Sequence, residues 1–151
     1  MEPVIIGCGN LDRGDDAAGL LVAQRLRELG VEALELSGEG LSLIETWSGA
    51  DEVILIDAVV TGSPPGKITI WDARQRGLVG DFFRCSTHAF GVAEAVELAR
   101  ILDRLPGRLL IYGIEGARFE MGSRPQPAVL KAVEQVAQEI VHEVALCTSL
   151  P

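Results

Sequence analysis

Short apolar runs alternate with amphipathic stretches along most of this chain. The run from Pro3 to Cys8 is continuously apolar and β-branched before glycines break it, which is typical of a buried parallel strand leading into a loop. Residues Asp16 to Leu29 then place apolar side chains at helical spacing, with acids at the start and Gly30 as the stop. The sequence therefore opens with a strand, a loop and a helix.

The same alternation continues to the end of the chain. Apolar patterning predicts further strands at Val31 to Ser37, Glu52 to Asp57, Lys67 to Trp71 (at a sheet edge) and Arg108 to Gly113. Helical spacing predicts helices at Leu41 to Trp47, His88 to Leu102 (begun by Ser86-Thr87) and Pro127 to Val144. Strands interleaved with helices predict an α/β fold, a three-layer α/β/α sandwich around a mostly parallel sheet. Such folds bind ligands at the carboxyl ends of their strands.

Composition narrows the class of protein. The chain has 151 residues, of which 48% are hydrophobic and 23% charged, so one globular domain over residues 1–151 is expected. Its 13 Lys+Arg against 22 Asp+Glu give a net charge of −9, which argues against a nucleic-acid partner. No apolar run approaches the ~20 residues of a membrane span. Three cysteines without paired spacing, and a start without a basic signal region, predict a cytoplasmic protein with reduced thiols.

The loop between the first strand and the first helix, Gly7 to Gly19, carries the most chemistry. It resembles a phosphate-binding G-x-G-x-x-G turn, but Asp12 stands where the last glycine belongs. Asp15 and Asp16 at the helix start would repel a phosphate and attract a cation. One of these acids can instead cap the helix, an alternative that the sequence leaves open.

Two more side chains are expected at the same edge of the sheet. Asp57 ends a predicted strand, although it can also form an Asx-turn into the following loop. His88 lies at the start of a predicted helix, and the segment before this helix returns to the same edge, although a lone histidine is often structural. With Asp16, these residues predict a site of two carboxylates and one imidazole. That ligand set suits zinc, nickel or a similar ion and leaves positions open for a substrate.

Other reactive side chains are weaker candidates. Cys8 ends a core strand and Cys147 lies in the tail, so packing or incidental roles are expected for both. Cys85 lies three residues before His88 and can be a nucleophile or a fourth ligand, but no second acid-base partner is near it in sequence. His142 is expected to be a solvated helix residue. The chain has no H-E-x-x-H motif and no serine or cysteine triad motif, so ordinary protease chemistry is not indicated.

Taken together, these motifs resemble one known family. The resemblance rests on Gly7-x-Gly9-Asn10, on Arg13-Gly14-Asp15-Asp16-x-x-Gly19, on Ile56-Asp57-Ala58 followed by Gly62 to Gly66, and on Ser86-Thr87-His88. In this order and spacing they are similar to the hydrogenase maturation endopeptidases that process nickel-iron hydrogenases. The match spans essentially the whole chain.

The resemblance implies a fold, an activity and a site. The fold is a five-stranded, twisted α/β/α sandwich, and the activity is removal of a C-terminal peptide from the hydrogenase large-subunit precursor after nickel insertion. Asp16 (Glu in some members), Asp57 and His88 take the positions of the family's metal-contacting and catalytic residues. The nickel is expected to be supplied by the precursor, and no organic cofactor is implied.

The sequence also leaves rival functions open. The same three residues would serve a non-catalytic, nickel-dependent chaperone or docking module for the precursor. A metal-dependent hydrolase of a small ester or amide is a further alternative. The chain departs from the family where many members carry G-x-Q-P, because it has Gly113-Ile114-Glu115-Gly116 instead. The role of Glu115 is therefore open.

Overall fold

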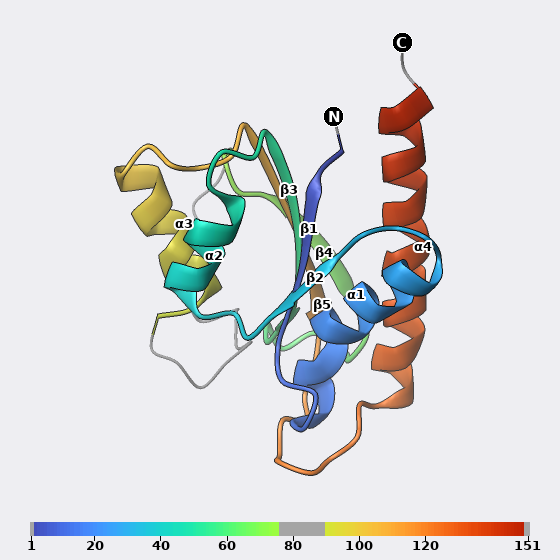
Figure 1. Ribbon diagram of the computed structural model, residues 1–151. Helices are drawn as coiled ribbons and strands as arrows, with labels where there is room; N and C mark the ends of the chain where they lie inside the picture. Colours follow the sequence, from blue (N-terminus) through green and yellow to red (C-terminus); the bar gives the residue numbers. More distant parts are fainter. Residues whose placement is uncertain (1, 76–89, 150–151) are drawn as a thin grey trace.

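In a computed structural model that describes residues 2–75 and 90–149, five strands form one sheet in the order β2-β1-β3-β5-β4 (Figure 1). The strands are β1 (Val4–Cys8), β2 (Leu34–Leu36), β3 (Glu52–Val59), β4 (Ile68–Asp72) and β5 (Arg108–Glu115). β1 runs parallel to β2 and β3, β3 runs parallel to β5, and only β4 is antiparallel to its neighbour in this sheet. The predicted α/β fold with a mostly parallel sheet is confirmed, as is the edge position of the strand near Lys67.

The strands differ from their predicted lengths at the edge and at the centre. β2 has only three residues and its Leu34 is 46% exposed, whereas a strand over Val31 to Ser37 was predicted. It is an edge strand paired on one side only, so few of its residues gain a ladder partner. The central strands β3 and β5 are longer than predicted, and Asp57 pairs with Gly113 within this ladder. Because β3 continues for two residues beyond Asp57, the alternative of an Asx-turn at Asp57 is wrong.

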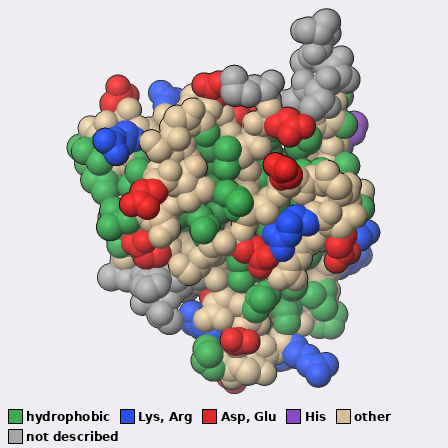
Figure 2. Space-filling view, in the orientation of Figure 1, with side chains coloured by type: hydrophobic (Ala, Val, Ile, Leu, Met, Phe, Trp, Pro, Cys, Tyr) green, Lys and Arg blue, Asp and Glu red, His purple; other side chains and the backbone are tan. Residues whose placement is uncertain are grey.

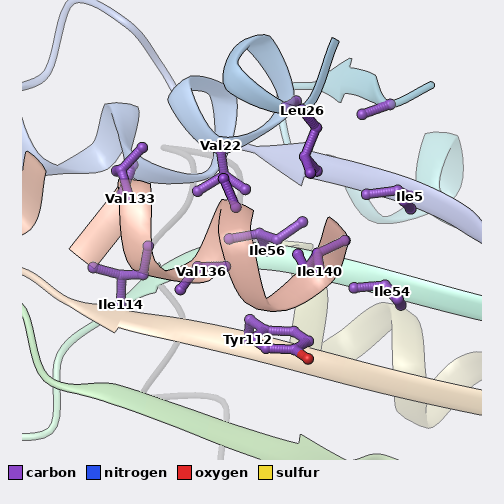
Figure 3. Packing of buried hydrophobic residues seen from close by; sticks show 14 of the residues in the cluster. Ile5, Val22, Leu26, Ile54, Ile56, Tyr112, Ile114, Val133, Val136 and Ile140 are labelled. Atoms are coloured by element: carbon purple, nitrogen blue, oxygen red, sulfur yellow. The ribbon is translucent and has the colours of Figure 1, made fainter. Parts of the chain in front are cut away.

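Helices cover both faces of the sheet. The 3-10 helix η1 (Gly14–Ala17) leads into α1 (Ala18–Glu28), and α2 (Gly40–Trp47), α3 (Val92–Ile101) and α4 (Pro127–Ser149) follow. α1 and α4 lie on one face, and α2 and α3 lie on the other (Figure 1). Figure 3 shows the α1–α4 side of the core, where Val22, Leu26, Val136 and Ile140 pack over Ile54 and Ile56 of β3.

The start of α3 differs from the prediction. The helix begins at Val92 rather than at His88, with Gly91 in an extended conformation as its N-cap, and the predicted start signal Ser86-Thr87 lies outside the described residues. Phe90 is fixed across the beginning of α2, because its carbonyl accepts a hydrogen bond from Gly40 N at 2.9 Å. A Cβ at Gly40 would lie 1.9 Å from the Phe90 ring. This long-range contact holds residues 90 and 91 outside the helix.

Glycines let α1 lie directly on the sheet. A Cβ at Gly19 would lie 2.3 Å from the Cys8 carbonyl oxygen and 2.4 Å from that of Ile56, and a Cβ at Gly7 would lie 2.1 Å from Gly19 O. No side chain fits between the helix and the two strands at this point. The close approach delivers η1 to the carboxyl ends of β1 and β3, where the predicted site residues lie.

Candidate active site

Asp16 lies in η1 at the carboxyl end of β1. Its side chain is fully buried, and its backbone carbonyl accepts a hydrogen bond from Asn10 N at 3.2 Å. Gly9 makes this turn possible, because its φ is +147° and a Cβ there would lie 1.9 Å from the Asp16 carbonyl oxygen. The glycine and the asparagine of the first loop therefore hold Asp16 against the end of the strand.

The two carboxylate oxygens of Asp16 have different surroundings. Oδ2 lies 3.5 Å from a guanidinium nitrogen of Arg13, whose side chain is 20% exposed. Oδ1 is buried and accepts no hydrogen bond from any residue that the structure describes. A buried polar atom left without a partner is costly, and such atoms are found where a protein binds a ligand, an ion or a reacting group.

The protonation of Asp16 follows from these surroundings. Burial raises the pKa of the Asp16 carboxyl from 3.8 to about 7, although the positive charge of Arg13 opposes the shift. The pKa of a general base is best placed near the working pH, so Asp16 is suited to accept and release a proton near neutrality.

This raised pKa predicts a pH-dependent stability difference between the wild type and Asp16→Asn. Between pH 3.8 and about 7 the folded protein keeps a proton on Asp16 that the unfolded chain has lost. The contribution of Asp16 to the free energy of unfolding therefore decreases as the pH rises through this window, by at most about 1.4 kcal/mol per pH unit, so the wild type becomes less stable. The amide of the variant does not titrate. Urea unfolding from pH 4 to 8 should show the variant gaining stability relative to the wild type up to about pH 7, and a constant difference would contradict the assignment.

Asp57 and Cys8 lie side by side on neighbouring strands, Cys8 at the end of β1 and Asp57 two residues before the end of β3. Each comes one residue after the last parallel pair of β1 and β3, Gly7 with Ile56, and each is fully buried. Cys8 and Leu55 pack on the face covered by α2 and α3, and alternate residues of a strand share a face, so Asp57 points to this side as well.

The electrostatics of Cys8 connect the two aspartates. Burial raises the pKa of the Cys8 thiol well above its usual value, and the carboxylates of Asp57 and Asp16 raise it further. Both carboxylates therefore lie within electrostatic reach of one sulfur atom. The protonated thiol is a poor nucleophile, which agrees with the packing role expected for Cys8.

Asp15 has a different role from its neighbour. Its buried carboxylate accepts hydrogen bonds from the backbone N–H groups of Ala117 (2.9 Å), Arg118 (3.0 Å) and Gln126 (2.8 Å), and from the Gln126 side chain (2.6 Å). Burial opposes ionisation of Asp15, but the hydrogen bonds outweigh it and hold the pKa below its ordinary range. Neither Asp15 nor Asp16 caps its own helix by a side-chain hydrogen bond, so the capping alternative is wrong. Asp15 instead binds the loop that joins β5 to α4.

The loop at residues 10–15 and the loop at residues 116–126 are interlocked. Backbone hydrogen bonds join Gly14 N to Ser123 O, Asp15 N to Arg118 O and Gly122 N to Asp12 O, at 2.7 to 3.1 Å. Gly14 has a φ of +55°, and a Cβ there would lie 2.5 Å from the Arg118 carbonyl oxygen. These contacts fix the backbone that leads into Asp16, and nothing in the sequence alone indicated them.

Glu115 holds the loop that follows β3. Its buried carboxylate accepts hydrogen bonds from Thr61 N at 2.8 Å and from Thr61 Oγ1 at 2.5 Å. The Glu115 carbonyl accepts another hydrogen bond from Gly66 N at 2.8 Å. Where the sequence departs from the family motif, the residue therefore anchors residues 60–66 beside the strand that carries Asp57.

The third predicted site residue, His88, lies outside the described residues, as does Cys85. Within residues 2–75 and 90–149, no three His, Cys, Asp or Glu side chains are grouped as metal ligands. His142 is exposed on α4, as expected. The structure therefore places two of the three predicted ligands, Asp16 and Asp57, and it adds Arg13 beside Asp16. The spacing of Arg13, three residues before Asp16, was the signal that could have identified it as an ion-pair partner.

Comparison with known proteins identifies the family. The hydrogenase maturation protease family model matches residues 20–143, and the chain belongs to this family. HupD of Thiocapsa roseopersicina is 29% identical over 152 residues, covering 91% of this chain and 68% of HupD. HoxM of Azotobacter vinelandii is 29% identical over 149 residues, covering 93% of this chain and 72% of HoxM. The resemblance derived from the motifs is confirmed.

Solved structures agree in fold. The hydrogenase maturating endopeptidase HybD of E. coli superimposes with a TM-score of 0.78 at 21% identity, covering 97% of this chain and 94% of HybD. The [NiFe] hydrogenase maturation protease HybD of Thermococcus kodakarensis gives a TM-score of 0.75 at 22% identity, covering 95% of this chain and 99% of that protein. The protein is thus a member of a protease family with the α/β fold of those enzymes.

The basic side chains on the face shown in Figure 2 are scattered. Lys and Arg stand apart from one another among acidic and apolar side chains, so this face has no continuous positively charged patch. None of the helices in the described part of the chain combines the length and the hydropathy needed to cross a membrane.

Proposed function

We propose that this chain is an endopeptidase that removes a C-terminal peptide from the nickel-loaded large-subunit precursor of a nickel-iron hydrogenase. Asp16, Asp57 and His88 would contact the nickel that the precursor already holds, so the metal is part of the substrate. Membership of the hydrogenase maturation protease family supports the reaction class. The recognition of nickel rests on the geometry of the two aspartates.

The observation that carries the proposal is the unpartnered Oδ1 of Asp16. It is a fully buried carboxylate oxygen at the carboxyl edge of the sheet, and the described residues give it no hydrogen bond. Asp57 contributes a second buried carboxylate within electrostatic reach of the same sulfur, Cys8 Sγ. Carboxylate oxygens at a site that admits a substrate suit a borderline divalent ion such as nickel.

The chemistry follows from bringing that ion to the strand ends. Docking of the precursor's nickel would fix the scissile peptide bond next to the two carboxylates, which removes most of the orientational cost of the reaction. The ion can polarise the peptide carbonyl or lower the pKa of an attacking water molecule. Asp16 or Asp57 then takes the proton from that water and passes it to the leaving amine.

The direct test follows the mass of the precursor. Purified precursor, with and without bound nickel, is incubated with this protein and sampled by mass spectrometry. We expect loss of a C-terminal peptide from the nickel-loaded form only. A stable complex without cleavage would instead establish the chaperone, and hydrolysis of small esters or amides with no action on the precursor would establish a different hydrolase.

A further inference from the structure

Arg13 is the cationic side chain that pairs with Asp16 in the described structure. Its NH1 lies 3.5 Å from Asp16 Oδ2, and its Nε donates a hydrogen bond to the Phe119 carbonyl at 3.3 Å. Both contacts are long for hydrogen bonds that involve a guanidinium group. Arg13 is therefore tethered beside Asp16 without saturating that carboxylate, because Oδ1 on the far side has no partner among the described residues.

This placement affects cations according to their charge. A divalent ion bound at Oδ1 would lie one carboxylate group away from the guanidinium, in a buried site where charges are poorly screened. A hydrated metal ion carries its full double charge into that position and is repelled. An ion already coordinated by thiolates has its charge neutralised or reversed by those ligands, so the repulsion disappears.

We propose that Arg13 is a specificity-determining residue that keeps free divalent ions out of the Asp16 site while admitting nickel coordinated by a protein substrate. The inference rests on the proposed function, since it assumes that Asp16 contacts the precursor's nickel. It explains how a carboxylate site can recognise a metal on a visiting protein without becoming filled by metal ions from solution.

The test measures the binding of free Ni²⁺ to the full chain by isothermal titration calorimetry at pH 8.5. The pH is set above the pKa of Asp16 because the charge of Arg13 lowers that pKa, and its removal nearer neutrality would add competition from protons. Arg13→Gln should bind Ni²⁺ about ten-fold more tightly than the wild type or more, because one like charge close to the ion has been removed. Arg13→Lys keeps the charge and should resemble the wild type. Arg104→Gln removes an exposed charge just before β5, at the opposite edge of the sheet from Asp16, and should have no effect.

A further variant ties the effect to the proposed site. Adding Asp16→Asn to Arg13→Gln should abolish the gain in Ni²⁺ affinity, and added free Ni²⁺ should inhibit precursor processing by Arg13→Gln at lower concentrations than it inhibits the wild type. Equal or weaker Ni²⁺ binding by Arg13→Gln, or a gain that survives Asp16→Asn, would overturn the inference. Failure of the wild type to cleave nickel-loaded precursor would instead overturn the proposed function, and that result is read from a separate assay.

Discussion

Replacing Asp16 by asparagine is expected to lower the rate of precursor processing by at least about a hundred-fold, the range for loss of a positioned acid-base group. The substitution keeps the size and shape of the side chain but removes the charge that would face the metal. The carboxylate is fully buried and lacks a hydrogen bond at Oδ1 among the described residues, so the change breaks few contacts in the free protein. The rate is measured as kcat/KM from the mass of the nickel-loaded precursor.

Asp12→Asn is the matched control for this experiment. Asp12 lies four residues earlier in the same loop and is exposed, and its backbone carbonyl rather than its side chain binds Gly122. We expect processing by this variant to match the wild type. Wild-type rates with Asp16→Asn, in a protein shown by circular dichroism to be folded, would remove Asp16 from the site.

Replacing Asp15 by asparagine is expected to destabilise the fold at neutral pH by about 3 kcal/mol or more. Four donors point at the two oxygens of the Asp15 carboxylate, so an amide group would have to turn its own N–H groups toward at least one of them. The loss of stability is measured by urea unfolding.

The effect of Asp15→Asn should also depend on pH. Because the pKa of Asp15 is lowered in the folded state, its stabilisation is present at neutral pH and is lost in acid. The difference between the variant and the wild type should therefore shrink as the pH falls below the ordinary aspartate range.

Glu120→Gln provides the comparison for Asp15. Glu120 is exposed on the same loop at residues 116–126, and within the described part of the chain its backbone carbonyl, rather than its side chain, accepts hydrogen bonds from Ser123. Its substitution should leave the free energy of unfolding almost unchanged. If Asp15→Asn is as stable as Glu120→Gln, the four hydrogen bonds do not hold the two loops together as described.

The sequence predicted the parts of the fold that depend on local hydrophobic patterning. The run Val53 to Ile56 indicated a central buried strand, and the acids of residues 15 and 16 drew attention to the loop between the first strand and the first helix. It did not reveal how the neighbouring aspartates divide their roles, because the partners of Asp15 lie more than one hundred residues away in the chain. The position of Asp57 at the carboxyl edge followed from the parallel topology, but the continuation of its strand did not.

The incorrect helix start shows the same limit of local reasoning. The apolar spacing before Leu102 extended back to His88, and Ser86-Thr87 resembled a cap. The contact between Phe90 and Gly40 overrides this local signal, because it holds the chain across the beginning of α2. The departure at Glu115 could not be interpreted from sequence for a similar reason, since its partner Thr61 is 54 residues away.

The central claim is that Asp16 and Asp57 can contact one metal ion. The most direct test is to soak a crystal of this protein in Cd²⁺ and to collect diffraction data at a wavelength where cadmium scatters anomalously. A millimolar concentration is chosen so that the ion fills the site despite repulsion by Arg13. We expect one strong anomalous peak at the carboxyl edge of the sheet, within bonding distance of Asp16 Oδ1 and of a carboxylate oxygen of Asp57. Cadmium bound only elsewhere, or a separation of the two carboxylates too large for one ion to bridge, would contradict the account.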